Sequence, residues 1–270
     1  MDLRKSEVKL DIPEKLPIVV EKWLKDGKRY FGSSGASLTH QIYNPKYDEE
    51  GLDKGPAKAG LSGERDTTKI LKDWMEDKPN VVLVDSVHIP GIGARSEEPD
   101  EEGIIDVGDT DHILIIGNNV ILLDSKAWKN KTTYAVGEDG VITRAKKDFP
   151  GGHVNMNAAY HLWEKYLKPI KPDVYAYIVI TQKEVFVGRD RNWWRQNFKL
   201  ITHKDIFDYK DDDGNDISGW LDKLYKETLT EEDKEFINID LVSMIVRGTI
   251  KPYDVEKEKL SLNNVYKLRE

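Results

Sequence analysis

The chain has 270 residues, no cysteine and a formal net charge of −8 at pH 7. The lack of cysteine excludes disulfides, thiolate metal sites and a cysteine nucleophile. No apolar run approaches the roughly 20 residues of a membrane-spanning helix, and the N-terminus lacks the apolar segment of a secretory signal. We therefore expect a cytoplasmic protein without a membrane partner. The acidic balance argues against a broadly basic nucleic-acid surface, but it permits a basic groove around a metal held by carboxylates.

The first part of the chain leads up to one clear helix. Residues 1–57 are an N-terminal extension in which only residues 16–24 have helical character. An amphipathic helix is predicted over residues 62–76, because apolar residues recur there at a spacing of three and four. Glu64 stands at the start of this helix and points toward the core. Residues 80–89 (NVVLVDSVHI) then predict a strand.

The most informative segment is a predicted β-hairpin at residues 109–128, DTDHILIIGNNVILLDSKAW. Two apolar runs flank Gly117-Asn118, a dipeptide suited to a two-residue turn. With this turn, Asp111 on the first strand stands directly opposite Asp124 on the second. Lys126 shares the face of Asp124, because side chains alternate along a strand. Facing carboxylates repel each other, so we expect a divalent cation between them.

Regular elements continue after the hairpin. Residues 132–145 predict a second hairpin, residues 154–167 a helix, and residues 173–181 a buried strand with residues 184–188 as its short partner. The order of helix, three antiparallel strands, helix and strand predicts an α/β fold. Its mixed central sheet contains an antiparallel three-strand meander flanked by helices.

The C-terminal part is predicted to be separate from this core. Residues 208–216 form an acidic, glycine-containing linker. Thr230 and Asp233 have the spacing of a capping box ahead of a helix over residues 236–245. We divide the chain into an N-terminal extension, a core, and an acidic linker with a helical C-terminal portion, at residues 1–57, 58–207 and 208–270.

The predicted hairpin and helix together offer the groups needed for phosphodiester hydrolysis. Mg²⁺ prefers one or two carboxylates, a carbonyl and several waters, which Asp111, Asp124 and the Ser125 carbonyl can supply. Mn²⁺ is expected to substitute. Lys126 can orient the attacking water or stabilise charge on the phosphate, and Glu64 would complete the acidic ring directly or through water. Taken alone, the triplet from Asp124 to Lys126 favours a simple surface ion pair. The presence of Asp111 opposite and of Glu64 on the preceding helix favours a metal-binding active site instead.

Four short sequence blocks occur in the same order as in a known protein family. They are GLSGE at 60–64, VVLVD at 81–85, DTDHIL at 109–114 and LDSKAW at 123–128. Together they resemble the nuclease-related domain, NERD, a branch of the PD-(D/E)XK nuclease superfamily, from about residue 60 to residue 181. The resemblance implies a restriction-endonuclease-like core and Mg²⁺-dependent cleavage of nucleic acid, DNA in preference to RNA. It implies the active-site quartet Glu64, Asp111, Asp124 and Lys126.

The chain departs from the family pattern at the helix after the hairpin. The family opens this helix with Asn-Pro-x-x-Gln, whereas this chain has Asn157-Ala158-Ala159-Tyr160-His161. Asn157 and His161 are candidates for contact with a substrate phosphate. The stretch over residues 90–108 is also longer than the family pattern and could form a loop over the substrate groove.

Basic and aromatic side chains downstream are further candidates for nucleic-acid contact. Lys129 and Lys131 follow the active strand beside Trp128. A second set lies within residues 188–199 and consists of Arg189, Arg191, Trp193, Trp194 and Arg195. For this second set the alternative is equally open, namely tryptophans packed on the core beneath arginines that reach past them to water.

The sequence leaves more than one role possible for two residues close to Asp111. His112 faces the opposite side of the sheet by alternation, which favours a structural hydrogen bond over metal ligation. Asp109 shares the face of Asp111 and is either an additional metal ligand or a turn residue. The main alternative to a nuclease is a catalytically inactive nuclease-fold protein that serves as a nucleic-acid-binding or assembly module. The chain has no Gly-rich NTP-binding loop, which argues against NTP hydrolysis.

Overall fold

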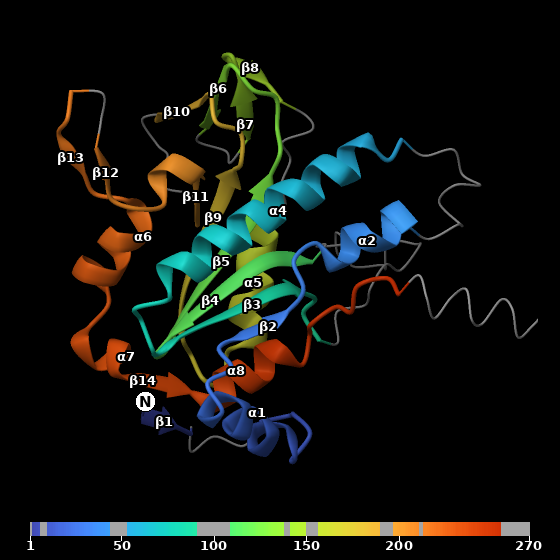
Figure 1. Ribbon diagram of the computed structural model, residues 1–270, viewed down its shortest axis with the longest axis vertical. Coiled ribbons are helices and arrows are strands. Elements are labelled where there is room, and N and C mark those ends of the chain that lie inside the picture. Colours follow the sequence, from blue (N-terminus) through green and yellow to red (C-terminus); the bar gives the residue numbers. More distant parts are fainter. Residues whose placement is uncertain are drawn as a thin grey trace, which may run out of the picture.

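A six-stranded mixed sheet forms the centre of the protein (Figure 1). The computed structural model describes residues 2–5, 10–43, 53–90, 109–137, 141–149, 156–189, 197–210 and 213–254. The sheet order is β11-β9-β5-β4-β3-β2. The strands are β2 (Tyr30–Gly32), β3 (Val81–Val87), β4 (Thr110–Ile116), β5 (Asn119–Lys126), β9 (Asp173–Ile180) and β11 (Phe198–Thr202). The predicted α/β class is confirmed, and the architecture is consistent with a restriction-endonuclease-like core.

The antiparallel meander β3-β4-β5 has the predicted register. Ile116 pairs with Asn119 across the two-residue turn, and the pairing continues to His112 and Leu123. The pairing ends there, and Asp111 and Asp124 lie directly beyond this last pair. Both β3 and β4 are buried along their whole length. Helices therefore cover both faces of the meander, which explains the nearly continuous apolar runs in its sequence.

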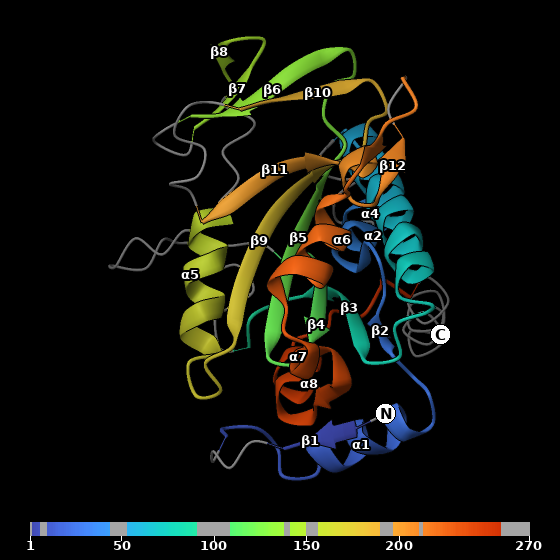
Figure 2. The same cartoon turned by 90° about the vertical axis from the view of Figure 1, so that its left-hand side faces the viewer.

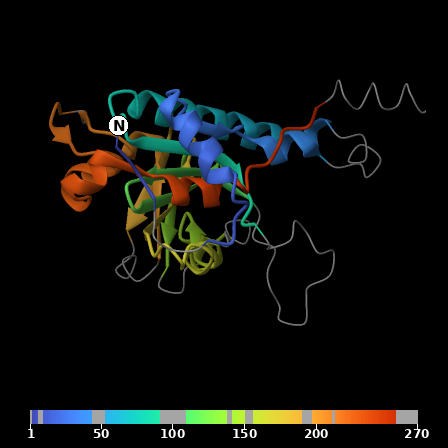
Figure 3. The same ribbon diagram turned by 90° about the horizontal axis from the view of Figure 1, so that it is seen from below.

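Helices α4 (Gly55–Trp74) and α5 (Met156–Tyr166) lie on opposite faces of the sheet (Figures 2 and 3). On the α5 face, Trp163 is fully buried, and its indole Nε1 donates a hydrogen bond to Thr110 Oγ1 at 2.8 Å. This bond fixes α5 to the residue that precedes Asp111. On the α4 face, Leu71 and Trp74 pack against apolar side chains of the meander. Burial of each such large side chain contributes roughly 1.5–3 kcal/mol to stability.

Helix α4 begins seven residues earlier than the sequence pattern indicates. It starts at Gly55 with proline at its first turn, so Glu64 lies in the middle of the helix and not at its start. Glycines at 60 and 63 weaken the helical signal, but both are sites of close packing. A Cβ at Gly60 would lie 3.0 Å from Leu38 Cδ1, and one at Gly63 would lie 2.8 Å from Thr181 Oγ1. Tertiary contacts therefore override the low helix propensity of glycine.

The predicted partner of the strand over residues 173–181 is wrong. Strand β10 (Val185–Arg189) pairs in parallel with β6 (Thr132–Val136) and not with β9. Both edges of β9 are already occupied, by β5 and β11. The predicted second hairpin is confirmed as β6 and β7 (Ile142–Arg144), although its turn at residues 138–140 lies outside the described residues. With β8 (Lys147–Asp148), these strands form a small sheet beyond one end of the large one (Figures 1 and 2).

The N-terminal extension and the C-terminal portion of the proposed division contact each other. Strand β1 (Asp2–Arg4) pairs in parallel with β14 (Phe236–Asn238), and α1 (Leu16–Lys25), predicted at residues 16–24, packs on α8 (Ile239–Val246). The predicted single helix over residues 236–245 is therefore wrong in its first three residues. Asn238 ends the strand and caps α8, because its side chain accepts a hydrogen bond from the Leu241 backbone N–H.

The remaining elements connect these parts. The capping box of Thr230 and Asp233 is confirmed, but the helix that it starts is the short α7 (Glu231–Glu235). The predicted linker over residues 208–216 contains β12 (Tyr209–Lys210), which pairs with β13 (Asp216–Ile217). The other helical segments are α2 (Ala36–Tyr43), η3 (His203–Asp205), α6 (Trp220–Lys223) and η4 (Leu224–Thr228). Within the described ranges, no helix is both long and apolar enough to cross a membrane.

The close contact between Gly63 and Thr181 allows a test of how tightly α4 packs at this position. We expect Gly63→Ala to destabilise the protein by about 1–2 kcal/mol, because overpacking against the stiff side chain of Thr181 outweighs a gain of about 1 kcal/mol in helix propensity. Urea unfolding measures the change. The same substitution should cost less in a Thr181→Ala background. A stabilising Gly63→Ala would show that α4 does not press on this residue.

Candidate active site

Asp111, Asp124 and Lys126 come together at one end of the meander. The Ser125 backbone N–H donates to Asp111 Oδ2 at 2.6 Å, and Lys126 Nζ donates to Asp124 Oδ1 at 2.7 Å. Asp111 is 5% exposed and Asp124 is 8% exposed. The positive charge expected beside the facing carboxylates is therefore supplied, at Asp124, by Lys126 itself.

Glu64 reaches the same region from the middle of α4. The buried stripe of this helix is apolar at Leu71 and Trp74 but polar at Glu64, Thr67 and Thr68. Glu64 is 4% exposed, and burial raises the pKa of its carboxyl to about 7. The carboxylates of Asp109 and Asp124 raise this pKa further, whereas His112 and Lys126 lower it. Glu64 therefore lies within the electrostatic field of the residues at the strand ends.

The other two charged groups respond to the same field in opposite ways. Burial raises the pKa of Asp111 well above its ordinary value, and the nearby carboxylates of Glu64 and Asp124 add to this. Burial disfavours the charged form of Lys126, but Asp124 and then Asp111 outweigh it, so the pKa of Lys126 is raised. The quartet thus places three carboxyl groups around one ammonium that stays protonated, and it has an excess of negative charge when all four ionise.

Two carboxylate oxygens of this group fit a metal. Among the described residues, Glu64 Oε2 and Asp124 Oδ2 are buried and have no hydrogen-bond partner. A buried acceptor without a partner costs about 1–3 kcal/mol, which a hard cation with oxygen ligands would offset. No three Asp, Glu or His side chains in the described ranges are placed to hold an ion as they stand. Mg²⁺ requires fewer, because it keeps several waters and takes one or two carboxylates.

The loop between β2 and α2 forms a wall of the site that the sequence did not reveal. Ser37 Oγ donates to Asp109 Oδ2 at 2.8 Å, so a residue of α2 holds Asp109, whose carboxylate raises the pKa of Glu64. Gly35 has a φ of 68°, and a Cβ there would lie 3.6 Å from Glu64 Oε2. The only signal for this wall was the pair of glycines around two serines after a short apolar stretch.

His112 lies on the α4 face of the sheet, as the alternation predicts, and it is fully buried. Its Nδ1 is 2.9 Å from Asp85 Oδ1, and its Nε2 is 3.0 Å from Ser125 Oγ. Burial lowers the pKa of His112, but the carboxylate of Asp85 outweighs burial and raises it. Asp85 was not among the residues singled out by sequence, although a charged residue within a buried strand is itself a signal.

The two lysines after β5 lie on the surface and outside the quartet. Lys129 and Lys131 are exposed, and Lys131 pairs with Glu184 at 3.6 Å. The neighbouring Trp128 does not form an open stacking surface with them. Its ring packs on Tyr134 at 5.0 Å and on Phe149 at 5.2 Å, so it joins the core beneath the small sheet.

The other candidate nucleic-acid contacts are only partly visible. Asn157 lies in the first turn of α5, and the exposed His161 follows one turn later. The His161 ring lies 3.5 Å from Glu164 and 3.1 Å from Asn197, two residues that do not belong to the quartet. Arg189 ends β10. The remaining candidates, Arg191, Trp193, Trp194 and Arg195, and the loop predicted over residues 90–108 from residue 91 onward, lie outside the described residues.

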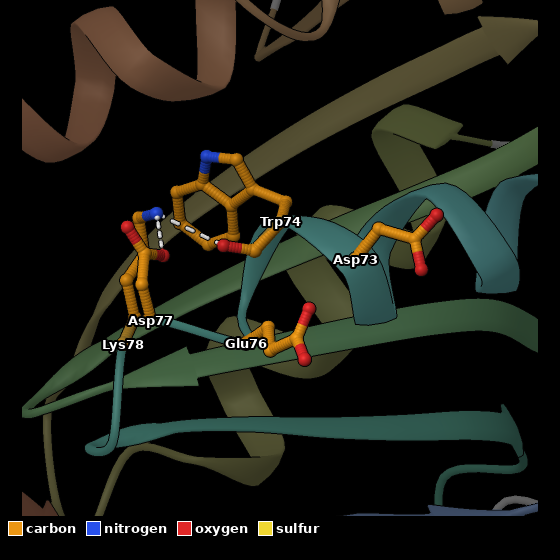
Figure 4. Close-up of a pocket in the computed structure, with 5 residues that line it drawn as sticks. All are labelled: Asp73, Trp74, Glu76, Asp77 and Lys78. Atoms are coloured by element: carbon orange, nitrogen blue, oxygen red, sulfur yellow. Dashed lines mark hydrogen bonds and ion pairs between the residues drawn. The ribbon is translucent and has the colours of Figure 1, made fainter.

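A pocket lies at the C-terminal end of α4, away from the quartet (Figure 4). It has a volume of about 450 Å³ and is lined by Asp73, Trp74, Glu76, Asp77 and Lys78. Lys78 Nζ donates hydrogen bonds to the Trp74 carbonyl and to Asp77 Oδ1. Along the helix axis, Trp74 is about 15 Å from Glu64. The pocket is therefore separate from the quartet.

The raised pKa of Glu64 predicts a pH dependence of stability without metal. The folded state holds the Glu64 proton up to a pH of about 7, whereas the unfolded chain releases it near its ordinary value of 4.5. This group therefore stabilises the protein fully below pH 4.5, and the contribution, of the order of 3 kcal/mol, is lost as the pH rises to about 7. The stability of Glu64→Gln relative to the parent should increase across this range and then level off.

Urea unfolding in EDTA at a series of pH values measures this difference. Glu76→Gln, an exposed substitution just past the end of α4, is the matched control. A difference between Glu64→Gln and the parent that stays constant from pH 4.5 to 7 would contradict the prediction.

Comparison with known proteins agrees with this geometry. Residues 59–181 match the family model for the nuclease-related domain, and this range contains all four residues of the quartet. Searches of curated proteins and of solved structures found no significant match. The segment from residue 59 to residue 181 is therefore a nuclease-related domain.

Proposed function

We propose that the protein is a Mg²⁺-dependent nuclease that hydrolyses phosphodiester bonds, with DNA as its substrate in preference to RNA. One observation carries the proposal: Glu64, Asp111 and Asp124 are buried around Lys126, and two of their oxygens have no hydrogen-bond partner among the described residues. Buried carboxyl groups with strongly shifted pKa values are typical of functional sites. The nuclease-related domain supplies the reaction class.

The four side chains would have different roles in the reaction. Asp111, Asp124 and the Ser125 carbonyl would hold the metal, and Glu64 would assist directly or through a water. When bound, Mg²⁺ neutralises charge on the phosphate and acidifies a water molecule. Lys126 stays protonated because its pKa is raised, so it acts by donating hydrogen bonds and not by accepting a proton. It is thus suited to orient the attacking water and to stabilise negative charge on the phosphate.

Binding of the nucleic acid would involve the basic groups around the site. Lys129 and Lys131 are exposed directly after β5, the strand that carries Asp124 and Lys126. We assign phosphate contacts to them first, and to Asn157, His161 and the segment over residues 189–195 second. Phosphate contacts of this kind give an affinity that falls with salt. We propose a cytoplasmic enzyme in which Mn²⁺ substitutes for Mg²⁺.

The second candidate function is an inactive nuclease fold that binds nucleic acid or assembles with a partner. The observation in its favour is the bond between Lys126 Nζ and Asp124 Oδ1, which occupies one oxygen of a proposed metal ligand. The net charge of −8 also favours it. Calorimetry with Mg²⁺ and Mn²⁺, with and without DNA, separates the two functions. DNA binding without metal binding or cleavage would support the inactive module.

The quartet predicts which substitutions abolish cleavage. Asp124→Ala and Lys126→Ala should each lower the cleavage rate by at least 10²-fold with the fold intact, because each removes a group that contacts the metal, the water or the phosphate. Plasmid, linear duplex, single-stranded DNA and RNA, each with Mg²⁺, Mn²⁺ or EDTA, are the substrates.

The matched control is Lys226→Ala. It removes the lysine of an exposed ion pair with Asp208 that has the same length, 2.7 Å. Circular dichroism verifies the fold of all variants. Metal-dependent cleavage at the parental rate by purified Asp124→Ala or Lys126→Ala would exclude the assignment.

A further inference from the structure

On the α4 side of the sheet, opposite Asp124 and Lys126, three polar residues from three adjacent strands form a buried hydrogen-bonded row. Asp85 of β3, His112 of β4 and Ser125 of β5 are 0%, 0% and 6% exposed. The His112 ring joins the other two, with Nδ1 at 2.9 Å from Asp85 Oδ1 and Nε2 at 3.0 Å from Ser125 Oγ. Burial of such groups is unfavourable unless each is bonded, so the row needs a reason to be present.

Both ends of the row are fixed by further hydrogen bonds. Asp85 Oδ2 accepts from Thr68 Oγ1 at 2.6 Å and from the Tyr30 hydroxyl at 3.0 Å. Ser125 Oγ donates to Thr67 Oγ1 at 2.9 Å. The two threonines belong to α4, the helix that carries Glu64 one turn earlier. The row therefore connects the helix of the quartet to the strands of the quartet.

Ser125 is the point at which the row meets the candidate site. Its backbone N–H holds Asp111 Oδ2 at 2.6 Å, and its neighbours in sequence are Asp124 and Lys126. Because alternate residues of a strand face opposite sides, fixing the Ser125 side chain below the sheet fixes the direction of its two neighbours above it. The position of the Ser125 hydroxyl thus sets three members of the quartet at once.

We propose that His112, oriented by Asp85, is a positioning residue that holds Ser125 and thereby aligns Asp111, Asp124 and Lys126 for metal binding. The inference rests on the proposed function. The same order of Asp, His and Ser occurs in serine hydrolases, where the serine is the nucleophile. Here the burial of His112 and Ser125 leaves a substrate no access to the hydroxyl, and Ser125 Oγ is also bonded to Thr67. Substitution of a residue that is hydrogen-bonded to a metal ligand typically weakens metal binding by about 10–100-fold.

Binding of Mn²⁺ alone to the purified full chain tests the proposal. Ser125→Ala removes the hydroxyl but keeps the backbone N–H and carbonyl, and His112→Gln removes the ring. Each should weaken Mn²⁺ binding in calorimetry at least tenfold, at a temperature where circular dichroism shows the protein folded. The double variant should bind no more weakly than the weaker single variant, because both changes break the same link.

Ser243→Ala is the matched control, because it also deletes a buried serine hydroxyl, one bonded to the Ile239 carbonyl in α8 at 2.7 Å. It should lower thermal stability in EDTA but leave Mn²⁺ affinity at the parental value. If Ser125→Ala binds Mn²⁺ with the parental affinity, or if the losses add in the double variant, the positioning role of His112 is wrong but the proposed function is not affected. A parent that binds no Mn²⁺ overturns the proposed function as well. If His112→Gln does not fold, the comparison of Ser125→Ala with Ser243→Ala decides.

Discussion

The structure around the candidate site depends on the burial of three carboxyl groups next to a single ammonium. Glu64, Asp111 and Asp124 are each less than 10% exposed, and Lys126 is bonded to Asp124. Removing such charges from water costs several kcal/mol per ion, and one attractive pair compensates only part of this. In the absence of metal, the protein lowers the remaining cost by holding protons on Glu64 and Asp111, as their raised pKa values indicate. In the proposed function, a bound cation would replace those protons and offset the cost of burying the carboxylates.

The rest of the fold keeps these groups in place despite their repulsion. The two-residue turn fixes the register of β4 and β5, and Asp111 and Asp124 lie directly beyond their last pair, His112 and Leu123. Close packing of Gly63 against Thr181 sets the depth of α4 and hence the position of the adjacent Glu64. Strand β5 lies between β4 and β9, so neither edge of the strand that carries Asp124 and Lys126 is free to move. Asp111, Asp124 and Lys126 are thus carried by inner strands of the sheet, which is the arrangement that a preorganised site requires.

The nuclease-related domain is completed by segments outside its matched range. Strand β2 extends the sheet beyond β3, and the loop that follows it brings Gly35 next to Glu64 and Ser37 to Asp109. Tyr30 of the same strand is bonded to Asp85. The N-terminal extension therefore contributes to the walls of the site and to the hydrogen-bonded row beneath it. Variation in this extension could change the site without any change in the quartet.

The sequence alone determined the features that depend on short-range chemistry. The hairpin turn, the alternation of side chains and the apolar runs were enough to predict the meander and the register of β4 and β5, because register follows from the turn and from counting residues. The capping box of Thr230 was equally local. Features that depend on contacts between distant segments could not be predicted and are seen only in the folded chain. The start of α4 depends on packing at Gly60 and Gly63, which no propensity reveals. The pairing of β10 with β6 depends on both edges of β9 being occupied, and the partner of β14 is a strand more than 230 residues away. The bond from Lys126 to Asp124 and the row from Asp85 to Ser125 likewise follow from side-chain geometry in the folded chain, and a sequence does not contain distances.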